Sequence, residues 1–299
     1  MSNTKAVTRR DFVKGAGAAA MGLAIGWPAL AEKEGTPIID KSRVVLIRDK
    51  NAIGTDGAVN GGVIRKMLDE AVVALCDKPD PTDCFAQMFT PEDIVGIKSN
   101  EWGPLPTPRE LEQALATRVA EVGVPEKNIA IDDRGVLHHE TFLNATALIN
   151  VRPMRTHAWS GVGSLIKNYI MFVEYPPDYH DDACASLGAI WKLPLVAGKT
   201  RLNIQVLLTP LFYGVGPHHF DREYIWAYNG LAIGFDPVAV DTVALRILQL
   251  KRREHFGEER TIKPSAHHIA YANTEYGLGH SDFDHIELIK LGWNQGVLI

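Results

Sequence analysis

Short apolar runs alternate with segments of helical spacing along most of this chain. In residues 63–75, apolar side chains recur every three or four positions, which predicts one face of a helix. Runs of four to seven mainly apolar residues predict buried strands. The predicted strands are Arg43–Arg48, Ile94–Lys98, Ile129–Asp132, Leu148–Val151, Leu202–Leu208, Leu231–Gly234 and Ile286–Lys290.

Two further helices begin at proline-containing signals. Residues 107–110 read Thr-Pro-Arg-Glu, a capping box with proline at the first helical position, and this helix should end at Gly123. Asp236 and Pro237 have the form of an N-cap and first residue of another helix, which the basic residues 251–253 close. The alternation predicts an α/β fold, a layered, mostly parallel central sheet with helices on both faces.

The first 31 residues are typical of a twin-arginine signal peptide. Arg9 and Arg10 lie in the segment TRRDFVK, an apolar run follows at 15–27, and Ala31 marks the expected cleavage site. The alternative is a membrane anchor, but the run is shorter than the roughly 20 residues that a spanning helix needs. We therefore expect export in the folded state by the Tat translocase to the periplasm, with no integral membrane span after cleavage.

The remainder should form a single α/β domain over 40–299. Its irregular middle, residues 174–230, is a candidate sub-lobe because prolines at 176 and 177 interrupt any helix there. The chain carries a formal charge of −5, and removing the +3 of the leader leaves −8. This acidic balance gives no electrostatic basis for binding nucleic acid.

The cysteine count limits the cofactors. The chain has three cysteines, Cys76, Cys84 and Cys184, and none of them forms a C-x-x-C pair. This chain alone therefore cannot build a four-thiolate iron–sulfur cluster. Export would make a Cys76–Cys84 disulfide reasonable, and two unpaired thiols are the alternative. No G-x-G-x-x-G follows a strand, so the fingerprint of NAD binding is missing, and no G-x-S-x-G elbow of a serine hydrolase occurs.

The stretch Ile149–Ile170 carries the strongest candidate chemistry. A predicted strand leads directly to Arg155 and His157, and a turn with small residues then leads to Lys167. Ligands of open α/β sheets bind beyond the carboxyl ends of strands, and glycines there let a ligand approach the backbone. The stretch therefore predicts a site for a small anion, whereas an ordinary strand–loop–helix connection with surface cations is the alternative.

Several motifs together resemble the domain-of-unknown-function family 362 (DUF362), from about Val44 to Gly292. The matching pieces are Lys98-Ser99-Asn100, Leu148-Ile149-Asn150 with Pro153, Arg155-Thr156-His157, Gly161-Val162, Lys167-Asn168, His180, Gly216-Pro217, the Asp-Pro-Val-Ala-Val-Asp of 236–241 and Gly277-Leu278-Gly279. The resemblance implies redox metabolism, because members of this family often carry or accompany ferredoxin-like iron–sulfur domains, so an iron–sulfur or other redox protein is a candidate partner.

The chain departs from the family pattern in three ways. It has Arg155 where lysine is common, Thr209 where an aspartate often follows the strand, and no ferredoxin cysteines. The change at Thr209 puts a metal or acid role at that strand end in doubt.

The matched residues suggest roles in one cleft. Three cations would bind a carboxylate, phosphate or sulfonate, with two amides orienting it. His157 would be a general acid or base, with a pKa near neutrality, and Asp241 would hold its tautomer. The predicted catalytic residues are His157, Lys167 and Asp241, and the predicted substrate-binding residues are Lys98, Asn100, Arg155, Asn168, Gly161 and Gly163.

A transition metal is a second interpretation of the same residues. Imidazole and carboxylate ligands suit zinc, nickel or iron, although no His-x-His or H-E-x-x-H spacing occurs. The candidate ligands are His157, His180, His218 and Asp241. Two function classes remain open: an exported enzyme acting on a small anion, and a non-catalytic binding or maturation partner of an exported redox enzyme.

Overall fold

The structure is a computed structural model that describes residues 41–216 and 218–299; the expected signal at 1–31 and Pro217 lie outside these ranges. The strands are β1 (Ser42–Arg48), β2 (Val95–Lys98), β3 (Ile129–Asp132), β4 (Ala147–His157), β5 (Gly161–Gly163), β6 (Thr200–Leu211), β7 (Gly230–Gly234) and β8 (Ile286–Gly292). The α-helices are α2 (Gly61–Cys76), α3 (Pro81–Met88), α4 (Arg109–Glu121), α5 (Glu140–Leu143), α6 (Leu165–Asn168), α7 (Asp181–Cys184), α8 (Pro237–Phe256) and α9 (His268–Thr274).

The strands form one sheet in the order β3-β2-β4-β6-β7-β1-β8. Neighbours are parallel except at β7, which runs antiparallel to both β6 and β1, and β5 folds back antiparallel onto β4. The predicted α/β class and mostly parallel sheet are confirmed. Segment 174–230 contributes β6 to the middle of this sheet.

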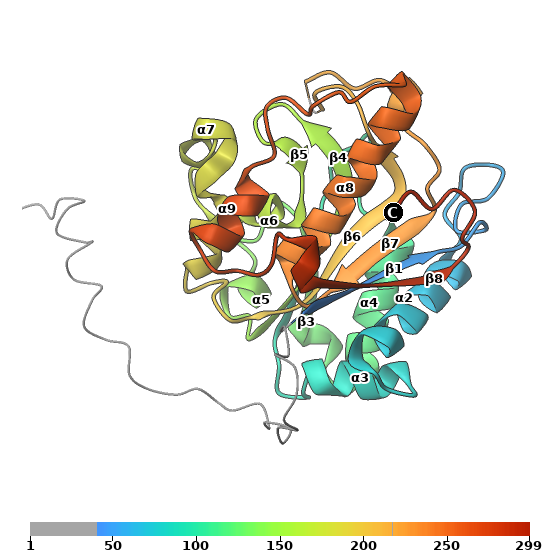
Figure 1. The fold of residues 1–299 in the computed structure, drawn as a ribbon. Helices are drawn as coiled ribbons and strands as arrows, with labels where there is room; N and C mark the ends of the chain where they lie inside the picture. Colours follow the sequence, from blue (N-terminus) through green and yellow to red (C-terminus); the bar gives the residue numbers. More distant parts are fainter. Residues whose placement is uncertain (1–40, 217) are drawn as a thin grey trace, which may run out of the picture. The chain divides into compact units, whose positions relative to one another are not determined.

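Helices cover both faces of the sheet (Figure 1). Alternate residues of β1 point to opposite faces, with Val45 and Ile47 facing α2, α3 and α4, and Val44 and Leu46 facing α8 and α9. Helices α2 and α8 each bury an apolar stripe against the sheet, which provides the main driving force for this layering. Within the described residues, no helix is long and apolar enough to span a membrane.

Two local predictions were wrong. The helix predicted from Thr107 begins at Arg109, because the Thr107 hydroxyl accepts the backbone N–H of Asn100 and does not cap the helix. The strand predicted to end at Val151 continues through Pro153 to His157. Pro153 is in register with Val206 of β6, and the pairing becomes irregular just after it, between Pro153 and Arg155; strands admit proline at such irregularities.

The proposed disulfide is also absent. Cys76 and Cys84 are free thiols in the structure. The buried Cys84 thiol donates to the carbonyl of Val72 at 3.3 Å instead. Burial raises the pKa of Cys84 to about 12, so this thiol stays protonated.

Candidate functional site

The carboxyl ends of β2 and β4 form a topological switch point. From β2 the chain crosses one face through α4 to β3, whereas from β4 it crosses the other face through α6 to β6. The two connections diverge from adjacent parallel strands, which opens a crevice between them. Residues that follow β2, β3 and β4 meet at this edge.

A cavity of about 320 Å³, here called the cationic pocket, lies in this crevice. It collects most of the residues predicted from sequence, drawn from the ends of three strands and from α6. Its lining comprises Asn100, Trp102, Asp133, Arg134, Arg152, Arg155, His157, Trp159, Lys167, Asn168, Ile170, Met171, Pro176 and His180. The predicted gathering of Arg155, His157 and Lys167 in one cleft is therefore present in the fold.

Lys98 supports the floor of the pocket and is completely buried. Its Nζ donates to Asp133 Oδ1 at 2.6 Å and to the carbonyl of Ser99 at 2.7 Å. Burial lowers the pKa of Lys98 to about 8, although the charge of Asp133 opposes that fall. The pKa of Asp133 lies below its ordinary value, because Lys98 and the backbone N–H of Glu101 outweigh the effect of burial.

A chain of amides fixes α6 to the sheet. Asn168 Nδ2 donates to Asn150 Oδ1 at 2.9 Å and to the carbonyl of Lys98 at 3.1 Å. Asn150 donates in turn to Asn203 Oδ1 at 3.3 Å, and Asn203 to the carbonyl of Phe235 at 2.9 Å. Asn168 thus positions Lys98 and α6, in addition to lining the pocket.

Two guanidinium groups are buried in the pocket without a carboxylate partner among the described residues. Arg155 donates to Asn100 Oδ1 at 2.9 Å and lies 4.5 Å from the ring centre of Trp102, and Arg152 donates weakly to the carbonyl of Ser164 at 3.4 Å. The Nε of each arginine has no hydrogen-bond partner. Burial lowers the pKa of Arg152 to about 10 and that of Arg155 well below its ordinary value.

His157 is held as a neutral ring. Its Nδ1 accepts the backbone N–H of Trp159 at 3.2 Å, so the single proton of the neutral imidazole lies on Nε2. Burial and the charges of Lys167, Arg152 and Arg155 lower its pKa far below the ordinary value. The predicted pKa near neutrality is therefore wrong, and the ring is suited to donate a hydrogen bond.

The candidate metal ligands do not converge. The indole of Trp159 lies between two of them, stacked on His180 with ring centres 4.3 Å apart and edge-on to His218 at 4.7 Å. No group of three or more His, Cys, Asp or Glu side chains in ranges 41–216 and 218–299 is arranged to hold a metal ion. His180 and His218 instead pack against the indole of Trp159, and His180 and Trp159 line the pocket beside the cations.

Asp241 lies behind the pocket and does not reach His157. Its carboxylate is fully buried and accepts the backbone N–H groups of Leu165 at 2.8 Å and Ile166 at 2.9 Å. The role predicted for it, orienting the imidazole, is wrong. Asp241 instead anchors the first turn of α6, the helix that carries Lys167.

The two predicted ligand-binding glycines serve the fold around the pocket. A Cβ at Gly163 would lie 2.6 Å from Nη2 of Arg152. Gly161 has φ +74° and its backbone approaches the carbonyl of Pro264, so a side chain is excluded on both grounds. Neither glycine lines the cavity.

Sequence reasoning missed Arg152, Asp133, Trp102 and Trp159. Arg152 lies just beyond the predicted strand, which ends at Val151, yet its alternation with Asn150 is a usable signal for the same face of a longer strand. Asp133 follows β3, and only the sheet order brings it to Lys98.

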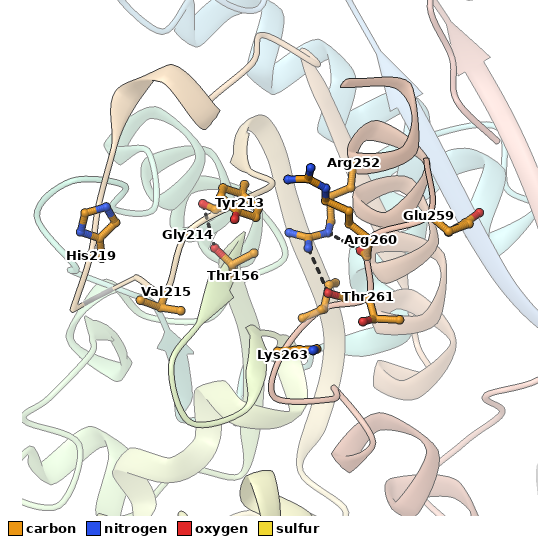
Figure 2. A pocket seen from close by; sticks show the side chains of 11 residues that line it. Thr156, Tyr213, Gly214, Val215, His219, Arg252, Glu259, Arg260, Thr261 and Lys263 are labelled. Atoms are coloured by element: carbon orange, nitrogen blue, oxygen red, sulfur yellow. Dashed lines mark hydrogen bonds between the residues drawn. The ribbon is translucent and has the colours of Figure 1, made fainter. Parts of the chain in front are cut away.

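A larger cavity of about 680 Å³ lies on the other side of the β4 end (Figure 2). Thr156 lines it, since its side chain points opposite to those of Arg155 and His157. Arg252, the buried cation there, already donates to the carbonyls of Phe212, Arg260 and Thr261. All three nitrogens of this guanidinium therefore have partners, in contrast to the guanidinium groups of the cationic pocket.

A family model described as Domain of unknown function (DUF362) matches residues 48–246. The match contains all of the residues that line the cationic pocket. No curated protein and no solved structure matches the chain.

Proposed function

Since this chain belongs to the DUF362 family, which has no assigned function, we propose from the pocket itself that it is an enzyme acting on a small anion. The bound group would be a carboxylate, phosphate or sulfonate. The observation that carries this proposal is the pair of buried guanidinium groups of Arg152 and Arg155, each with an unpartnered Nε.

The charge balance of the pocket supports the proposal. Arg152, Arg155 and Lys167 form no ion pair in the described part of the chain, and the carboxylate of Asp133 is already paired with Lys98. Burying unpaired charges is costly, and proteins retain them where a ligand supplies the opposite charge. A guanidinium fork also matches the planar oxygens of a carboxylate or the oxygens of a phosphate.

The pocket also offers groups for chemistry. The Nε2–H of His157 would stabilise charge that develops on a substrate oxygen, as a fixed hydrogen-bond donor in a site shielded from water. Lys167, whose pKa burial lowers to about 8, would transfer protons near neutral pH. This pairing of an oxygen-stabilising donor with a base favours an enzyme over a passive binding protein.

We further propose that the protein works outside the cytoplasm, exported by the twin-arginine route that residues 1–31 suggest. Replacing both Arg9 and Arg10 by lysine should retain the protein in the cytoplasmic fraction. The second candidate function, a non-catalytic partner in the maturation of an exported redox enzyme, would use the same export route, so export alone does not separate it from an enzyme.

Calorimetric titration with sulfate tests the site. Wild-type protein should bind one sulfate, and the Arg155→Met variant should bind it at least tenfold more weakly. The control variant Arg201→Met replaces an exposed arginine on β6 and should bind sulfate with wild-type affinity. Equal affinity in all three would reject the pocket as the anion site.

A second measurement separates an enzyme from a binding protein. Small carboxylic acids incubated with the protein in D2O should exchange a C–H proton next to the carboxylate for deuterium. Proton NMR measures this exchange as the loss of the C–H signal. The exchange should be lost in Lys167→Met. Binding without any exchange would favour the maturation partner.

A further inference from the structure

Lys167 and Lys98 are both buried lysines of the site, but their amines have different surroundings. Lys98 Nζ has three oxygen acceptors, the nearest being a carboxylate, and it is saturated. Lys167 lines the cavity, and its Nζ donates a hydrogen bond to Cys184 Sγ at 3.5 Å. Lys98 is therefore a fixed cation, whereas Lys167 is available for reaction.

Cys184 does not supply a fixed anion to Lys167. Burial raises the pKa of this thiol, although Lys167 opposes the rise, so the thiol stays protonated at neutral pH. The thiol is placed by three consecutive non-glycine residues with positive φ, Asp182 at 46°, Ala183 at 51° and Cys184 at 68°. Such a conformation is costly and persists where the surroundings fix it, commonly at functional sites.

The neighbours of Lys167 favour its neutral amine. Burial, followed by the charges of Arg152 and Arg155, lowers its pKa to about 8. Roughly one molecule in ten then carries the free amine at pH 7. Desolvation beside other cations is a recurrent way to activate a lysine for attack on a carbonyl carbon.

A substrate for this arrangement needs two groups. The guanidinium groups of Arg152 and Arg155 match a carboxylate, and the Nε2–H of His157 matches a carbonyl oxygen. A cavity of about 320 Å³ restricts the remainder to a small molecule.

Building on the anion site proposed above, we propose that Lys167 is a Schiff-base lysine and that its substrate is a small 2-oxo acid. The neutral amine attacks the carbonyl carbon, the carbonyl electron pair moves to oxygen, and a proton passes from nitrogen to oxygen. The carbinolamine takes up one proton from solvent, its C–O bond breaks with release of water, and the nitrogen pair forms the C=N bond. The product is a protonated imine, an electron sink for bonds at the adjacent carbon.

Reductive trapping with pyruvate tests this step. Wild-type protein treated with pyruvate and cyanoborohydride should carry a stable adduct, located at Lys167 by peptide mass mapping. Excess sulfate should protect Lys167, and acetone, a carbonyl compound without a carboxylate, should label it at least tenfold less. The exposed Lys192 and Lys263 report the background reaction in the same sample.

The Lys167→Arg variant keeps the charge but lacks the nucleophile. It should give no adduct at this position, whereas labelling of the exposed Lys192 should be the same as in wild type. If wild type binds sulfate and yet pyruvate labels Lys167 no faster than Lys192, the Schiff base is refuted while the anion site stands. If wild type does not bind sulfate, the anion site itself fails. A folded variant is recognised by an unchanged melting curve.

Discussion

Replacing Arg152 by methionine should make the protein more stable and its anion site weaker. Burial lowers the pKa of this arginine from 12.5 to about 10, even with Asp133 and Asp241 attracting it. That fall corresponds to about 3 kcal/mol of unfavourable free energy for the charged form. Because the folded-state pKa lies below the unfolded value, the penalty is present throughout the range below pH 10.

Methionine would keep much of the apolar stem and remove both the charge and the unpartnered Nε. Loss of the 3.4 Å hydrogen bond to the carbonyl of Ser164 offsets part of the gain. We expect a net stabilisation of about 1–3 kcal/mol, which raises the melting temperature by roughly 2–6 °C. Loss of a charge-assisted contact should weaken sulfate binding by about 1.5–3 kcal/mol, roughly 10- to 150-fold.

Differential scanning fluorimetry over a sulfate series measures both effects in one assay. The Arg152→Met protein should melt above wild type without sulfate and gain less from added sulfate. Arg201→Met is the matched control at an exposed site on β6 and should change neither quantity. If Arg152→Met melts several degrees lower and keeps the full response to sulfate, the arginine serves the fold and our reasoning is wrong.

Three further predictions concern the same pocket. Sulfate affinity should be constant below pH 8 and fall by up to tenfold per pH unit above it, because Lys167, with a pKa of about 8, loses its proton. If the affinity of Lys167→Arg for sulfate falls in the same way above pH 8, another group is responsible for the titration. Asp133→Asn should lower the free energy of unfolding, measured in urea, by about 3–5 kcal/mol, because it leaves Lys98 charged and unpaired. The double variant with Lys98→Met should recover most of this free energy. If it recovers none, Asp133 stabilises the fold through other contacts. Gly163→Ala should displace the flexible end of Arg152 and weaken sulfate binding with little loss of stability, whereas Gly161→Ala should destabilise the fold by about 1–3 kcal/mol. Equal effects on stability would contradict the view that Gly163 matters chiefly through its contact with Arg152.

The sequence predicted several elements closely because their signals are local. The apolar periodicity of residues 63–75 marks α2, and the Asp236-Pro237 pair marks the start of α8, where Asp236 Oδ1 accepts the N–H groups of Val238 and Ala239. The sequence did not predict the last part of β4, because a proline such as Pro153 commonly ends a strand. The irregular pairing with β6 that follows Pro153 is visible only in the folded sheet.

By itself, the sequence determined the α/β class, the family and the cations that follow the strands, since hydrophobic spacing and short motifs are properties of neighbouring residues. Only the tertiary structure decided which of those side chains face one cavity. It paired Lys98 with Asp133, turned Asp241 toward α6, placed Trp159 between His180 and His218, and left Arg152 and Arg155 with no carboxylate partner among residues 41–216 and 218–299. The reason is physical: burial, charge pairing and the pKa of a group depend on neighbours that the sheet order brings together from distant parts of the chain.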